Sequence, residues 1–154
     1  MTAGIVPDPA WVRPLRDPCD PMQEFEDLGR SAMGQWLAAD WRALGCTALL
    51  AHNDETAVGV IEVLQDAGVQ VPGEVSVVGF DGLDIADYFR PRLTTIEVPL
   101  EEIGAQGARL LLRHIREGAA TSPALDQDGA GQLELACRLK IGDSSGSPRS
   151  PSRG

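Results

Sequence analysis

Cysteines are few in this 154-residue chain, and long apolar runs are lacking. Its three cysteines, Cys19, Cys46 and Cys137, lie far apart and without metal-ligand spacing, which is typical of reduced thiols in a cytoplasmic protein. No apolar run approaches the ~20 residues that a membrane-spanning helix needs. Nor does the amino end show a charged segment followed by an apolar one, as a secretion signal would. We therefore predict a cytoplasmic protein that does not cross a membrane.

Basic residues are also scarce. The chain has 13 Lys and Arg residues against 23 Asp and Glu residues, and its formal net charge is −10. Binding to the phosphate backbone of a nucleic acid needs a cluster of Lys and Arg side chains, and the sequence contains none. These residues are therefore not expected to contact DNA directly.

Motifs for catalysis and for metal or cofactor binding are absent as well. The patterns H-E-x-x-H, C-x-x-C and G-x-x-x-x-G-K-[ST] do not occur. The run from Gly142 to Gly146 matches the nucleophile pattern G-x-S-x-G, but no histidine follows it, as that chemistry would require. We predict a protein without enzyme activity, catalytic residue, metal or cofactor.

The rest of the sequence has the pattern of an α/β protein. Hydrophobic residues make up 43% of the chain and aromatic residues 5%, which is ordinary for this class. Continuous apolar runs at 47–51 and 75–80 are typical of strands buried on both faces of a parallel sheet. A helical pattern between them completes one right-handed βαβ unit. The predicted fold is a Rossmann-like parallel sheet flanked by helices.

The pattern divides the chain into five segments. Five of the 11 prolines fall within the first 21 residues, and proline cannot sit inside a helix or a central strand. The tail is rich in Ser, Gly and Pro, a composition typical of disorder. The segments are a connector at 1–22, an α/β lobe at 23–99, a helix at 100–118, a loop and final strand at 119–141, and a disordered tail at 142–154.

Helix ends in the α/β lobe are marked by capping residues. Apolar residues at helical spacing follow Phe25, and we predict one helix from there to Gly45, because glycine suits a helix end. Asp54 is expected to cap the next helix, at 54–67, because its carboxylate can accept hydrogen bonds from free backbone N–H groups. The apolar face of the first helix contains Leu28, Met33, Trp36, Leu37 and Trp41.

Polar residues follow both buried strands. His52, Asn53 and Asp54 follow the first strand, and Asp81 follows the second. Ligands of open α/β sheets bind outside the carboxyl ends of the strands, so these side chains indicate a site for the hydroxyl or amide groups of a small polar ligand. The simpler interpretation is that Asp54 only caps a helix and Asp81 only starts a turn. Phe25 could stack on a planar ligand or serve as a hydrophobic staple.

Four blocks of sequence, in the same order, resemble the LacI/GalR (lactose-repressor) family of bacterial transcription regulators. The family's strand–ND–helix signature is matched by ALLAHNDETAVG at 48–59, and its P-x-D-[IV]-S-V-V-G-F-D-D segment by VPGEVSVVGFDG at 71–82. The segment P-x-L-T-T-[IV] is matched by RPRLTTI at 90–96, and the helix after it by residues 104–112. Together these blocks fall within residues 48–112 of the chain.

This resemblance implies one lobe of a periplasmic-binding-protein-like domain, in which two lobes close on an effector such as a sugar or nucleobase. It implies effector contacts at Asn53 and Asp81, with Phe25 as the stacking aromatic. It also implies a homodimer with the helix at 54–67 and the segment at 83–91 in the interface, and operator DNA bound through an amino-terminal headpiece. Nothing upstream resembles that headpiece or the first lobe, so we expect the carboxyl-terminal part of a regulator.

The chain departs from the family pattern at two glycines. Gly82 replaces the usual second acidic residue, and Gly142 replaces the usual arginine near the end. The helix at 100–118 would also lack the first lobe as its packing surface. Burying one Leu or Ile contributes ~1.5–3 kcal/mol, so we predict that a dimer mate or the chain's own lobe covers its apolar side. That side contains Leu100, Ile103, Leu110, Leu111 and Ile115.

The leading hypothesis is therefore an effector-sensing and dimerisation part of a LacI/GalR-like transcriptional regulator, for which repressor is the family's usual role. A solute-binding protein of a sugar transporter shares the fold, but its full gene would carry a signal peptide or lipoprotein cysteine. A Rossmann-like enzyme would need a cofactor loop or a nucleophile, and the sequence shows neither.

Overall fold

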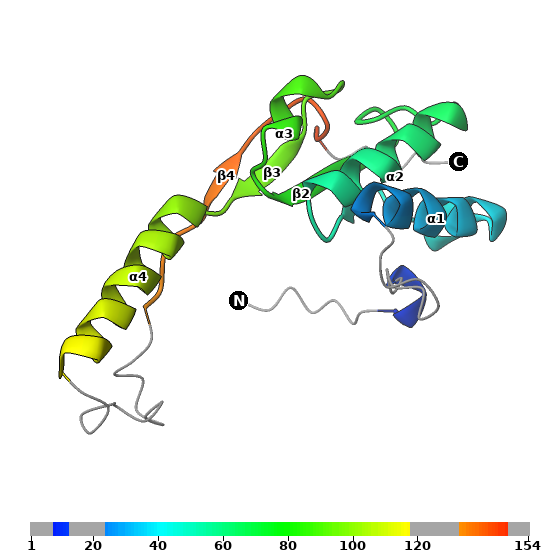
Figure 1. The fold of residues 1–154 in the computed structure, drawn as a ribbon. Coiled ribbons are helices and arrows are strands. Elements are labelled where there is room, and N and C mark those ends of the chain that lie inside the picture. Colours follow the sequence, from blue (N-terminus) through cyan, green and yellow to red (C-terminus); the bar gives the residue numbers. More distant parts are fainter. Residues whose placement is uncertain (1–7, 13–23, 118–132, 148–154) are drawn as a thin grey trace. The chain divides into compact units, whose positions relative to one another are not determined.

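The computed structural model of this chain describes residues 8–12, 24–117 and 133–147 (Figure 1). The chain forms two compact units. One consists of Met1–Glu97 with Leu139–Gly154, and the other of Val98–Arg138. The first carries the α/β fold described below, and the described part of the second is dominated by one long helix.

The sheet has four strands in the order β1-β2-β3-β4. Strands β1 (Ala48–Leu50), β2 (Ser76–Asp81) and β3 (Thr94–Glu97) run parallel. β4 (Arg138–Lys140) is the fourth strand and is shorter than the predicted final strand. Parallel strands joined by helical crossovers confirm the predicted α/β class.

Helices α1 (Phe25–Ala38) and α2 (Asp54–Asp66) pack side by side (Figure 1). Two glycines permit this close approach, because a Cβ atom on Gly29 would collide with the carbonyl oxygen of Thr56, and one on Gly59 with that of Glu26. Eight of the 13 residues of α2 are buried within the chain. Little of α2 is therefore left for the dimer interface in which the resemblance puts this helix.

The core lies between these two helices and the sheet. It joins apolar side chains from α1, α2 and β2 with residues of the connecting loops. Its fully buried members include Met33, Ile61, Leu64, Val75, Val77 and Leu93.

The first helix ends earlier than the sequence pattern predicts. α1 ends at Ala38, and Asp40 has a backbone φ of 54°, in the left-handed region that stops an α-helix. A short 3-10 helix, η2 (Trp41–Leu44), follows, and Gly45 with φ 65° closes η2 instead of α1. Trp41 is buried as predicted, but from η2. The prediction of one helix reaching Gly45 is wrong.

The start of the predicted tail is also ordered, and this corrects its boundary at residue 142. Ser144 is fully buried, and its hydroxyl donates to the carbonyl oxygen of Val77 at 2.6 Å and accepts from the Thr94 backbone N–H at 2.8 Å. Asp143 pairs with Arg92 at 2.7 Å. Short polar side chains here satisfy backbone groups of β2 and β3, so residues 142–147 belong to the fold. Residues 148–154 lie outside the described residues.

Gly142 and Ser144 also account for the G-x-S-x-G match. A Cβ atom on Gly142 would collide with the Arg92 carbonyl oxygen, so an arginine at that position would not fit here. The Ser144 hydroxyl is enclosed and hydrogen-bonded on both sides, which makes it a structural group. A buried serine cannot reach a substrate, so the match to the nucleophile pattern is accidental.

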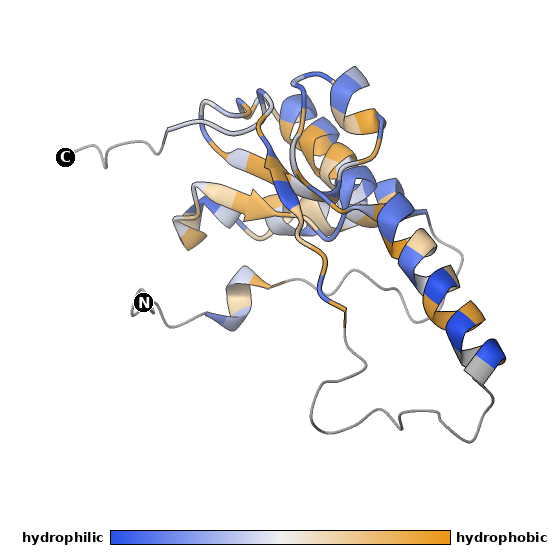
Figure 2. Cartoon of the chain, turned by 90° about the vertical axis from the view of Figure 1, so that its left-hand side faces the viewer, coloured by the Kyte–Doolittle hydropathy of each residue, from blue (hydrophilic) through white to orange (hydrophobic). Residues whose placement is uncertain are grey.

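Helix α4 (Leu100–Glu117) dominates the described part of the second unit. Apolar and charged residues alternate along it (Figure 2). Its predicted apolar side, Leu100, Ile103, Leu110, Leu111 and Ile115, is between 38% and 67% exposed. What covers that side stays a prediction. Among the described residues, no helix combines the length and the apolar character needed to cross a membrane.

The remaining elements are short. A 3-10 turn, η1 (Pro9–Trp11), falls in the proline-rich connector, most of which lies outside the described residues. Helix α3 (Ile85–Tyr88) follows β2. Cys46 and Cys137 are free thiols, and Cys19 lies outside the described residues.

Candidate functional site

The carboxyl ends of β1 and β2 meet at one edge of the sheet because the two strands are parallel neighbours. His52 and Asn53 lie in the loop that leads from β1 to α2, one residue after the end of β1, and Asp81 is the last residue of β2. The structure thus places two of the predicted contacts, Asn53 and Asp81, at the edge where open α/β sheets bind ligands.

Asn53 is the residue that caps α2. Its backbone is extended, with φ −150° and ψ −177°, and its Oδ1 accepts a hydrogen bond from the Thr56 backbone N–H at 2.9 Å. The prediction that Asp54 is the cap is therefore wrong by one residue. Because capping uses the side-chain oxygen Oδ1 of Asn53, the side-chain NH₂ is the group that can donate to a ligand.

Asp54 points into the protein instead. It is fully buried at the first position of α2, and its carboxylate accepts from the Thr95 hydroxyl at 2.5 Å and from the Leu83 backbone N–H at 2.7 Å. Burial raises the pKa of this carboxyl above its ordinary value, although the bonds from Thr95, Leu83 and Gly82 act in the opposite direction.

Asp81 has an unusual backbone conformation. Its φ of 101° lies in a region that L-residues rarely adopt, and Gly82 follows with φ 76°. A Cβ atom on Gly82 would also approach Glu97 to 2.8 Å. Both observations explain the first departure from the family pattern, since an acidic side chain at position 82 would be strained and crowded here.

Phe25 lies next to His52. As the first residue of α1 it is 42% exposed, and its ring centroid is 5.7 Å from that of His52, with the planes tilted by 33°. Sequence reasoning counted His52 among the polar residues after the first strand but did not pair it with Phe25 or name it as an effector contact.

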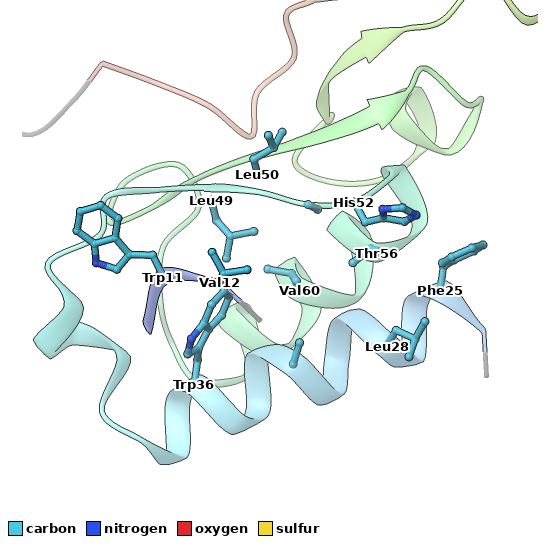
Figure 3. A pocket seen from close by; sticks show the side chains of 12 residues that line it. Trp11, Val12, Phe25, Leu28, Trp36, Leu49, Leu50, His52, Thr56 and Val60 are labelled. Carbon is cyan, nitrogen blue, oxygen red and sulfur yellow. The ribbon is translucent and has the colours of Figure 1, made fainter. Parts of the chain in front are cut away.

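Phe25 and His52 also line a cavity of about 550 Å³ between α1, α2 and β1 (Figure 3). Its walls are mainly apolar, and neither Asn53 nor Asp81 is among its lining residues. One buried polar atom on the wall, the Thr56 hydroxyl, has no hydrogen-bond partner among the described residues. The apolar lining consists of Trp11, Val12, Leu28, Ala32, Trp36, Leu49, Leu50, Ala51 and Val60.

Lys140 pairs with two carboxylates near β3. Lys140 Nζ lies 2.7 Å from Asp87 and 3.8 Å from Glu97, which is the β3 partner of Asp81. The Asp87 carboxylate raises the pKa of Lys140 and keeps this ammonium charged. Within the described ranges, no three His, Cys, Asp or Glu side chains are placed to hold a metal ion. The chemistry available at this edge is hydrogen bonding and ring stacking.

Sequence comparison identifies a domain family and relatives that are transcriptional regulators. Residues 12–145 match the periplasmic binding protein-like domain. The HTH-type transcriptional regulator GalR of Salmonella typhimurium strain LT2 is 45% identical over 87 residues, which is 56% of this chain and 25% of GalR. The HTH-type transcriptional repressor PurR of Photobacterium profundum is 32% identical over 115 residues, which is 75% of this chain and 31% of PurR.

Solved structures give the same result. A LacI family transcriptional regulator from Arthrobacter sp. FB24, in complex with lactose, superposes with a TM-score of 0.66 and 27% identity over 80% of this chain and 43% of that one. The complex of the transcriptional regulator CelR with cellobiose gives a TM-score of 0.65 and 32% identity over 78% of this chain and 33% of CelR.

The chain spans only 25% of GalR and 31% of PurR. The matched residues 12–145 nevertheless include both units of the fold and all three predicted contacts. On this match the chain belongs to the periplasmic binding protein-like domain family, and it is similar there to the effector-binding domains of LacI/GalR regulators.

Proposed function

We propose that this chain is the carboxyl-terminal part of the effector-binding domain of a LacI/GalR-like transcriptional repressor, and that it binds a sugar or another small polar ligand. One observation carries the proposal: Asn53 and Asp81 lie at the carboxyl ends of adjacent parallel strands, in a chain whose relatives are such regulators. Two of the similar structures hold lactose and cellobiose.

Each predicted contact has a chemical role. The NH₂ group of Asn53 donates to a hydroxyl oxygen of the ligand, and the Asp81 carboxylate accepts from hydroxyl groups. The exposed ring of Phe25, with His52 beside it, offers an apolar face for stacking on a sugar or base. These residues form one wall of the cleft, and the first lobe of the complete regulator supplies the other.

Regulation in this proposal follows from lobe closure. The ligand shifts the regulator between conformations only as far as its affinity for them differs. Operator DNA is contacted by an amino-terminal headpiece, because the acidic residues of this chain offer no phosphate-binding surface. The homodimer contact uses the segment 83–91, where Tyr88 is 78% exposed. Relatives that are regulators favour this role, and a cytoplasmic location, over a transporter's solute-binding protein or an enzyme.

The test is isothermal titration of the full regulator with lactose, cellobiose, ribose and a set of nucleobases. We expect one class to bind, and Asp81→Ala to weaken binding about tenfold or more, because it removes a charged hydrogen-bond acceptor. The matched control is Glu101→Ala, which removes an exposed carboxylate outside both the proposed site and the proposed dimer segment. Binding that is unaffected by Asp81→Ala contradicts the site assignment.

A further inference from the structure

Asp54 connects the two loops that carry the proposed effector contacts. It follows Asn53 in the chain, and its Oδ2 accepts from the backbone N–H of Leu83, two residues after Asp81. A hydrogen bond from the Gly82 backbone reaches the same carboxylate. One buried side chain therefore joins the start of α2 to the turn after β2.

The sheet beneath this carboxylate is built to receive it. Gly79 on β2 and Thr95 on β3 are register partners. A Cβ atom on Gly79 would collide with Asp54 Oδ1, and the same oxygen accepts from the Thr95 hydroxyl at 2.5 Å. Gly79 on β2 thus leaves room for the Asp54 carboxylate, and Thr95 on β3 supplies a hydrogen-bond donor to it. Both Asp54 and Thr95 are fully buried.

The turn that Asp54 holds has a conformation that needs support. Asp81 and Gly82 have consecutive positive φ angles of 101° and 76°. A non-glycine residue in this region persists only where the surrounding structure fixes it, and such residues cluster at ligand sites. The bond from Leu83 to Asp54 fixes the chain directly after these two residues.

We propose that Asp54 is a positioning residue, which sets the spacing between Asn53 and Asp81 through the backbone of residues 82–83 and through Thr95. This inference rests on the proposed function, because that proposal is what makes Asn53 and Asp81 effector contacts. Full burial keeps Asp54 itself away from the ligand. It acts on binding only through its two neighbours.

The first experiment compares Asp54→Ala with Asp54→Asn in the full regulator. Asparagine can accept from Leu83 with its oxygen and donate with its NH₂ to Thr95, whose hydroxyl also accepts, whereas alanine can do neither. We expect the Leu83 amide to exchange with deuterium about tenfold faster in Asp54→Ala, with most of the protection recovered in Asp54→Asn. Amide exchange needs no ligand, so this result does not depend on the identity of the effector.

A second pair of variants covers the case in which Asp54→Ala fails to fold. Thr95→Val keeps the size of the side chain and removes the donor, and Thr95→Ser keeps the donor. Thr95→Val should speed exchange of the Leu83 amide by a few-fold, and Thr95→Ser should leave it near the wild-type rate. Lactose is the first ligand to test. If it binds, its affinity should fall more in Asp54→Ala than in Asp54→Asn, and more in Thr95→Val than in Thr95→Ser.

The outcomes separate this inference from the proposed function. Unchanged Leu83 exchange in Asp54→Ala and Thr95→Val overturns the positioning role, whatever happens to binding. Equal loss of affinity in Asp54→Asn and Asp54→Ala also overturns it, because that result indicates a role for the charge itself. If Asp81→Ala leaves ligand affinity unchanged, the proposed site fails, and the exchange data still decide whether Asp54 holds the turn.

Discussion

Helices α2 and α4 share an amphipathic pattern and two acidic residues in the first turn, Asp54 and Glu55 in one and Glu101 and Glu102 in the other. Eight of the 13 residues of α2 are buried, whereas none of the described side chains of α4 is. The pattern of apolar residues thus predicts a helix in both cases, because it reflects local periodicity. Whether that apolar side is covered depends on packing surfaces elsewhere, and α2 has them in α1 and the sheet.

The largest expected difference between the two helices concerns a leucine on each. Leu64 on α2 is fully buried, and Leu111 on α4 is 62% exposed. Leu64→Ala should lower the free energy of unfolding by ~2–5 kcal/mol, because it leaves a cavity in the core. Leu111→Ala should change it by about 0.5 kcal/mol or less, as is usual for a surface substitution. Urea unfolding followed by circular dichroism measures both.

A large cost for Leu111→Ala would break this comparison. It would mean that the apolar side of α4 is covered in solution. A stability that rises with protein concentration would then assign the cover to a second chain, as the sequence pattern predicts. A stability independent of concentration would assign it to the chain itself.

Two helical glycines give the next largest contrast. A Cβ atom on Gly59 of α2 would collide with the carbonyl oxygen of Glu26, whereas one on Gly104 of α4 meets nothing within 4 Å. Gly59→Ala should therefore destabilise by ~1–3 kcal/mol, because a packed backbone cannot yield easily. Gly104→Ala should stabilise by ~0.5–1 kcal/mol, because alanine favours the helix. Thermal unfolding of both variants measures the difference, and equal signs would contradict the packing described for α2.

The same contrast shows what sequence alone could supply. Strands β1 and β2 and helices α2 and α4 follow from apolar runs and helical spacing, and the polar tripeptide that comes after β1 marks the site edge. The choice between Asn53 and Asp54 as the cap was not predictable, because both are good capping residues and Thr95, 41 residues away, decides it. Ser144 fell in the predicted disordered tail, because its hydrogen-bond partners lie 50 and 67 residues away in the sequence.

The pH dependence of stability should come from the buried start of α2. A raised pKa means that folded Asp54 holds its proton more tightly than the unfolded chain does. From the ordinary aspartate pKa up to the raised one, stability should therefore fall as pH rises, by at most about 1.4 kcal/mol per pH unit for one proton. Chemical unfolding at several pH values should show this slope in the wild type and lose it in Asp54→Asn.

The pKa of Asp143 is shifted in the opposite direction, so its contribution to stability changes with pH in the opposite sense and over a lower pH range. Its hydrogen bond to Arg92 lowers the pKa of this exposed carboxyl, so its contribution is present above the ordinary aspartate pKa and is lost as pH falls below it. At pH values above the ordinary aspartate pKa, Asp143→Asn should therefore lower stability slightly, and it should remove this loss of stability on the acid side. A slope above the ordinary pKa that survives Asp54→Asn would show that another group causes it.

The smallest expected effect concerns the ion pairs of Arg30, one of which joins α1 to α2. Arg30 on α1 donates to Glu62 on α2 at 2.7 Å and to Asp27 at 2.6 Å, but its side chain is 38% exposed. Exposed pairs contribute little, so Arg30→Gln should cost about 1 kcal/mol or less, and salt should reduce that cost by screening. Arg113→Gln on exposed α4 is the matched change. The contradicting result is a cost for Arg30→Gln well above ~1 kcal/mol that salt does not reduce. Such a result would mean that charge pairing holds α1 on α2, rather than the close contacts at Gly29 and Gly59 and the burial of Leu64.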